Sequence, residues 1–202
     1  MQCTFILQLY PSAAQQSALL ETMHSYNAAA EQIVRTAIDQ GTGSRVELQR
    51  LVYTRIREQF RLPAQLVVGA IGKASAAYKA LAHFSDHPVL LTEGAVMYDH
   101  RVLRITDLVA VSLSTIQGRI VVPFAIHGYQ RPHLHANPEL SYLLLQDGVF
   151  YCALTREVPG PVPRIEEEIV VIDLGIRAGV EYVSTWQEEA AQEVLENLPS
   201  SG

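Results

Sequence analysis

The spacing of the apolar residues changes near residue 88, and this change restricts the fold more than any other feature of the sequence. From residue 12 to residue 84, apolar side chains recur at the three- and four-residue spacing of amphipathic helices. From Val89 to Val158 the period falls to two, in short runs separated by turn residues. Helices followed by many short strands predict an α+β protein, with an antiparallel barrel or sandwich in its second half.

The helical part opens with a clear start signal. Residues 2–10 alternate as a strand does, and Pro11 ends that strand. Ser12 and Gln15 form a capping-box signature, and the helix that follows should stop near the glycines at 41–43.

Two more helices are expected before the change of period. Ser44 and Glu47 repeat the capping-box signature at the start of the second helix. The third helix begins at Leu62-Pro63, and its many alanines and glycines predict close packing against the other two.

Seven short strands are expected after the helices. Asp147-Gly148, between LSYLLLQ and VFYCALT, is the clearest hairpin turn in the sequence. The strands are placed near residues 89–92, 95–98, 101–105, 109–113, 119–124, 139–145 and 149–157.

Size and composition exclude several classes of protein. The chain has 202 residues, of which 49% are hydrophobic, so a substantial core is expected. No apolar run approaches the roughly 20 residues that span a membrane, and no membrane partner is expected. Cys3 and Cys152 form no CxxC pair, so neither a disulfide framework nor a zinc site is indicated. These features predict a cytoplasmic protein.

The net charge of −6 is unevenly distributed along the chain. Residues 1–87 hold eight Lys and Arg against six Asp and Glu, and residues 88–163 hold five against six. Residues 164–202 hold two against nine, so the acidity is concentrated in the C-terminal tail. The remainder is near neutral, and a nucleic-acid partner is not excluded.

Three arginines of the second helix suggest phosphate contacts. Arg50, Arg57 and Arg61 fall within about 40° of one another around a helix. They indicate either a solvated basic edge or a row of guanidinium groups that follows a nucleic-acid backbone. Tyr53 beside them could stack on a base or pack in the core. Weaker candidates for phosphate contact are Lys73, Lys79, Arg119 and Arg131.

The stretch EEEIVVIDLGIRAG contains a candidate catalytic acid. An apolar run that ends in Asp173 predicts a buried strand with a carboxylate at the edge of a sheet. This pattern occurs in magnesium-binding nucleases of the RNase H-like fold and in the first phosphate loop of actin-like ATPases. It also fits an aspartate that caps a turn. A phosphate loop this late in the chain leaves too little sequence for the second half of a nucleotide cleft.

Other catalytic motifs are missing from the sequence. His127, His133 and His135 include an HxH pair, but no third ligand lies at local spacing, so a loop is favoured over a metal site. No GxxxxGK[ST], GxSxG, HExxH or GxGxxG occurs, so nucleophilic and dinucleotide-dependent enzymes have no support.

Four segments, in order, resemble the TnpB (OrfB) transposon-encoded RNA-guided nucleases, which are relatives of type V CRISPR effectors. These segments are FILQLYPSAAQQSALLE, LPAQLVVGAIGKASAAYKAL, ELSYLLLQDGVFYCALTREVPGP and VVIDLGI. The resemblance implies a wedge-type β-barrel from residues 1–10 and 88–163, with a helical recognition insertion at 11–87. Residues 164–202 would be a linker, the truncated start of a RuvC-like, RNase H-like domain, and an acidic tail. It also implies guide RNA and target DNA as partners, and Asp173 as a catalytic magnesium ligand.

The sequence departs from this family after Asp173, where only 29 residues follow. Two-metal cleavage needs several converging carboxylates, and these residues cannot build the rest of the nuclease sheet. We therefore expect no DNA cleavage by this chain alone, and magnesium only if a second chain completes the site. Three readings stay open: a nuclease-deficient nucleic-acid-binding module, one half of a split endonuclease, and a decayed insertion-sequence product without activity.

Overall fold

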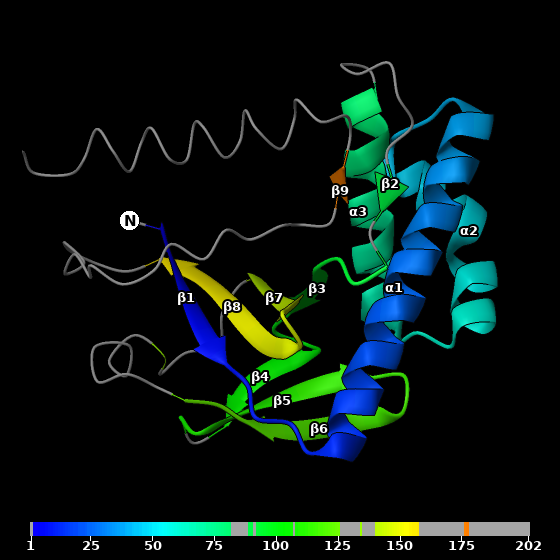
Figure 1. Ribbon diagram of the computed structural model, residues 1–202. Helices are drawn as coiled ribbons and strands as arrows, with labels where there is room; N and C mark the ends of the chain where they lie inside the picture. The colour runs from blue at the N-terminus through cyan, green and yellow to red at the C-terminus, as the bar shows by residue number, and fades with distance from the viewer. Residues whose placement is uncertain are drawn as a thin grey trace, which may run out of the picture.

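The computed structural model describes residues 2–81, 89–90, 92–106, 108–125, 134, 140–157 and 176–177. It confirms the α+β class and the order of one strand, three helices and then short strands (Figure 1). The helices are α1 (Ala13–Gln40), α2 (Arg45–Phe60) and α3 (Ala64–Leu81). The strands are β1 (Gln2–Gln8), β2 (Val89–Leu90), β3 (Val96–Asp99), β4 (Leu103–Thr106), β5 (Ala110–Thr115), β6 (Gly118–Pro123), β7 (Leu140–Gln146), β8 (Val149–Glu157) and β9 (Ile176–Arg177).

Both ends of α1 lie where the sequence predicts them. The Ser12 hydroxyl accepts the Gln15 N–H, and the Gln15 side chain accepts the Ser12 N–H at 2.9 Å, which completes the capping box. Gly41 ends the helix with φ of 63°, in the left-handed region that glycine adopts at low cost.

Only half of the second capping box forms. Ser44 caps α2 and its hydroxyl accepts the Glu47 N–H at 3.4 Å. The Glu47 carboxylate instead accepts from the Thr42 hydroxyl, and the Ser44 N–H donates to Thr42 Oγ1 at 3.2 Å. Thr42 therefore takes the place that Glu47 was expected to fill.

The small side chains of α3 let the three helices approach closely, as expected. Ala70, Ala74 and Ala77 are fully buried. A Cβ added to Gly43, between α1 and α2, would lie 2.6 Å from Cδ1 of Tyr78 on α3, so this contact requires glycine.

The strands that the structure describes form three antiparallel sheets. The largest has the order β1-β8-β7-β3, β4-β5-β6 form a second, and β2 pairs with β9. The predicted hairpin joins β7 to β8: Asp147 and Gly148 both have positive φ, at 50° and 78°, as a type I′ turn requires.

The strands do not form a closed barrel in the part of the chain that the structure describes, and the wedge-type barrel stays a prediction. β3 and β4 are joined by a tight turn but belong to different sheets, so the ladder is interrupted there. The two larger sheets meet where Leu9 bridges Phe124 and the Tyr10 N–H donates to Pro123 O at 2.8 Å. They also meet where the Tyr98 hydroxyl of β3 donates to Ser114 O of β5.

The helices and the two larger sheets share one hydrophobic core. Met23 and Ile33 of α1, Leu66 of α3, Leu103 of β4 and Leu143 of β7 are all fully buried in the same cluster. The division into a barrel and a helical insertion therefore stays a prediction.

The start of α1 is also fixed to the second sheet by polar contacts. The Ile116 N–H donates to Thr22 Oγ1 at 3.1 Å, and the Gln15 side chain donates to Val121 O at 2.7 Å. α2 packs on α1 and α3, on the side of the helical unit away from the sheets (Figure 1).

Several predictions lie outside the described residues. These are the linker at 159–164, the apolar strand at 169–172 with Asp173, the acidic tail, Arg131, and the three histidines His127, His133 and His135.

Candidate nucleic-acid interface

α2 separates apolar and basic residues onto different faces. Leu48, Val52 and Ile56 are fully buried against the neighbouring helices, whereas Arg50 and Arg57 are exposed on the opposite side. Seven residues separate the two arginines, so they point in nearly the same direction, about 10 Å apart along the axis. Because the apolar spacing fixes the rotation of α2, this arrangement follows from the sequence.

Arg61 follows the helix instead of belonging to it. α2 ends at Phe60, and Arg61 is the C-cap residue with φ of 53°. The helical angle predicted for its side chain therefore does not apply, although Arg61 is exposed and directly follows the last turn. A non-glycine residue in the left-handed region costs about 1 kcal/mol. A left-handed residue at this position is a common way to end a helix.

The three arginines form no hydrogen bond or ion pair with any described residue. Other basic side chains of the helices do have partners: Arg55 donates to Thr36 Oγ1 at 3.2 Å, and Arg35 pairs with Glu31 at 2.5 Å. Residues 45–61 hold five arginines and two glutamates, a formal charge of +3 in a chain of net charge −6. We call the exposed Arg50, Arg57 and Arg61 the α2 arginine row.

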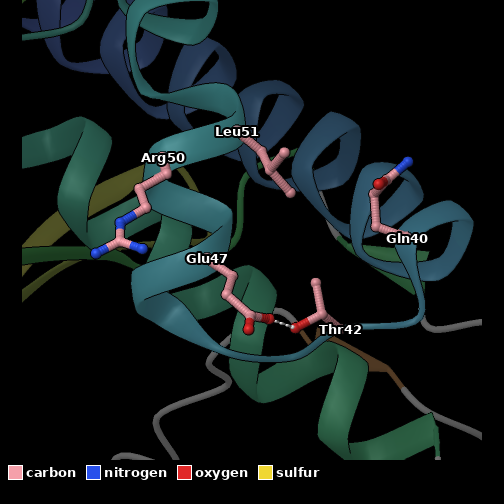
Figure 2. Close-up of a pocket in the computed structure, with 5 residues that line it drawn as sticks. All are labelled: Gln40, Thr42, Glu47, Arg50 and Leu51. Carbon is pink, nitrogen blue, oxygen red and sulfur yellow. Dashed lines mark hydrogen bonds between the residues drawn. The ribbon is translucent and has the colours of Figure 1, made fainter.

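A shallow hollow lies beside this row, at the junction of α1 and α2 (Figure 2). Its volume is about 280 Å³, and Gln40, Thr42, Glu47, Arg50 and Leu51 line it. Thr42 and Glu47 are hydrogen-bonded to each other, and the Arg50 guanidinium points away from them. A hollow that contains a carboxylate and an exposed leucine does not favour a phosphate, so we assign no ligand to it.

Lys73 was predicted as a weaker phosphate contact, but its ammonium is engaged inside the protein. It donates to Asn27 Oδ1 at 2.7 Å and to Ala95 O at 3.1 Å, and it lies 5.9 Å from the centre of the Tyr26 ring. These groups already compensate its charge, so we leave Lys73 out of the interface. Lys79, in the last turn of α3, is exposed.

Two further predicted residues are also held by the protein. Arg119 is exposed, but its guanidinium donates to Ser112 Oγ at 3.1 Å, and to Ser114 Oγ and Arg101 O, each at 3.0 Å. Tyr53 is half-buried and packs against the hydrophobic core, which matches the second of its two predicted roles.

Arg104 was not among the predicted residues, yet it is exposed on β4. The signal was available, because LRIT alternates apolar and polar residues and so places Arg104 opposite Leu103 and Ile105. Arg104 forms no hydrogen bond or ion pair with the described residues.

The described residues include no group of three His, Cys, Asp or Glu side chains that could hold a metal ion. None of the described helices has the length and apolar character that crossing a bilayer needs. No family model matches the chain, and no curated protein matches it significantly.

Proposed function

We propose that this chain is the nucleic-acid-binding part of a TnpB-like protein, and that the α2 arginine row contacts phosphates of a guide RNA or its DNA target. The observation that carries the proposal is the row itself: three exposed arginines without a partner among the described residues, two on the surface of α2 and the third at its C-cap. Guanidinium groups bind phosphate in a bidentate manner and supply much of the affinity for nucleic acid. Such contacts position the nucleic acid and do not read its sequence.

We also propose an assignment for the sheets, for the helices and for Asp173. The two larger sheets would be the wedge-type barrel of that family, and α1, α2 and α3 its recognition helices. Asp173 would bind magnesium only in a complex with a second chain that supplies the other carboxylates. Alone, the chain would bind nucleic acid without cleaving it.

The first test is the binding of a labelled single-stranded RNA by the full chain over a range of salt concentrations. The triple variant R50Q/R57Q/R61Q should bind more weakly, and the slope of log K against log salt should become shallower by up to about 2, since each phosphate contact contributes about 0.7.

A matched control separates the effect of the α2 site from the effect of lowering the net charge of the protein. The variant Q16E/S17E/A28E also lowers the charge by three, at exposed positions of α1. It should keep the wild-type slope. Equal slopes for wild type and the arginine variant would remove α2 from the interface, and a wild-type chain that binds no RNA at low salt would overturn the proposed function.

A further inference from the structure

The outer face of the β4-β5-β6 sheet combines two arginines with two serines. Arg104 of β4 is paired with Ser112 of β5, and Ser114 of β5 is paired with Arg119 of β6. Because side chains alternate along a strand, these four residues share one face, while Leu103 lies on the buried face. Both arginines are exposed.

Arg119 is fixed on this face before any ligand arrives. Its Nη1 donates to Ser112 Oγ, and its Nη2 donates to Ser114 Oγ and Arg101 O. The guanidinium therefore keeps its charge at the surface with little conformational freedom to lose on binding. Each serine oxygen accepts an N–H from Arg119. Ser112 is buried, whereas Ser114 is half-buried, so the Ser114 hydroxyl can donate to a further acceptor at the surface.

Arg104 is the second exposed cation of this face. All five of its N–H donors are without a hydrogen-bond acceptor in the described part of the chain. It lies next to Ser112, and the Arg119 guanidinium reaches the same serine from the other side. Neither guanidinium is ion-paired with a carboxylate of the described residues. Asp99, the acid near the start of β4, pairs instead with Arg101 at 3.5 Å.

We propose that this face is a second phosphate-binding surface, in which Arg104 contacts the phosphate and Arg119, with Ser114, provides a fixed cationic and hydroxyl platform. The ligand class is the phosphodiester backbone of a nucleic acid, and the inference rests on the proposed function. This second surface lies on the β sheet, whereas the α2 arginine row lies on the helical unit, so the two surfaces can be tested separately.

The test is the Arg104→Gln variant in the same RNA-binding assay. The side chain has no described partner, so the thermal unfolding temperature should not change. Affinity at low salt should fall about fivefold and the salt slope should become shallower by about 0.7. Arg104→Lys should keep the slope but lose part of the affinity, because lysine keeps the charge without the bidentate fork. Arg35→Gln, which removes an exposed arginine from α1, should bind as the wild type does.

The outcomes distinguish this inference from the proposed function. If R50Q/R57Q/R61Q loses affinity and Arg104→Gln does not, the sheet surface is wrong and the proposed function stands. If Arg104→Gln alone loses affinity, the sheet surface stands and the α2 row is wrong. Absence of wild-type binding overturns both.

A competition experiment separates a backbone phosphate from a free one. Inorganic phosphate and chloride are added at equal ionic strength to the wild-type complex with RNA. Equal displacement by the two salts supports a surface for the polynucleotide backbone. Selective displacement by inorganic phosphate that is abolished in Arg104→Gln would indicate a small-anion site and overturn the backbone assignment.

Discussion

Lys73 and Asn27 connect the helices to the loop before β3. The Asn27 amide donates to Thr92 O at 3.1 Å and to Gly94 O at 2.7 Å, and Lys73 bonds both Asn27 Oδ1 and Ala95 O. Asn27 is buried and Lys73 half-buried. Hydrogen bonds to a charged group away from water are stronger than ordinary ones. These two side chains therefore hold the loop in place at the edge of the largest sheet.

Lys73→Met should lower the free energy of unfolding by about 2 kcal/mol, because it leaves Asn27 Oδ1 and Ala95 O without their charged donor. Urea unfolding measures this change. Lys79→Met is the matched control: it removes an exposed lysine from the same helix and should change stability by less than about 0.5 kcal/mol. Equal effects of the two substitutions would show that the buried contacts contribute little.

At the scale of elements, the connection between α1 and α2 depends on two glycines for different reasons. Gly41 has φ of 63°, and a Cβ there would meet nothing within 4 Å. Gly43 has no such backbone requirement, but the Tyr78 ring occupies the place of its Cβ, and Ser75 Oγ donates to its carbonyl at 2.6 Å. One glycine permits a helix end and the other permits helix packing.

Gly43→Ala should therefore destabilise the protein by about 1–3 kcal/mol through overpacking. Gly41→Ala should cost about 1 kcal/mol through backbone strain. In a Tyr78→Ala background the cost of Gly43→Ala should nearly vanish, while that of Gly41→Ala should stay the same. Chemical denaturation of the three single and two double variants measures both couplings. A Gly43→Ala cost that persists without Tyr78 contradicts the steric explanation.

The molecule as a whole buries several groups that ionise at alkaline pH. Tyr26, Tyr98 and Cys152 are fully buried in the shared core. Burial raises the pKa of each of the three groups above the ordinary value of its residue type, which is near 10 for tyrosine and near 9 for cysteine. Tyr98 remains hydrogen-bonded, since its hydroxyl donates to Ser114 O at 3.0 Å.

These raised pKa values predict a loss of stability at high pH. The unfolded chain loses these protons first, so the stability that they contribute is complete below about pH 9 and falls as pH rises further. The fall should begin with Cys152, and each group can contribute up to about 1.4 kcal/mol per pH unit. Urea unfolding at a series of pH values from neutral to alkaline measures this fall in the free energy of unfolding.

Cys152→Ala provides the control for this prediction. It should lower stability at neutral pH through a cavity, yet make the fall between about pH 9 and 10 shallower. An unfolding free energy that stays constant up to about pH 10.5 would contradict the assignment of these groups as buried and neutral.

Much of this fold was predictable because its signals are local. The capping box at Ser12, the end of α1 at Gly41 and the hairpin at Asp147-Gly148 each depend on a few neighbouring residues. The open arrangement of the sheets was not predictable, because it depends on which strand edges pair across the chain. Arg61 was misplaced for a related reason: the helical spacing continues through it, but the backbone turns into the left-handed region one residue earlier than the pattern suggests.

By itself, the sequence determined the α+β order of the elements and the outward direction of Arg50 and Arg57, because residue spacing fixes which side of a helix is apolar. Only the tertiary structure decided which basic side chains are available to a ligand. Lys73 carries the same formal charge as Arg50, but the Asn27 side chain and the Ala95 carbonyl, brought to it by folding, occupy its donors. Arg119 is also held by folding, yet its guanidinium stays exposed. Ala95 is 22 residues from Lys73, and Arg101 is 18 residues from Arg119. Acceptors at such separations leave no periodic trace in the sequence, so the fold alone distinguishes a structural cation from a free one.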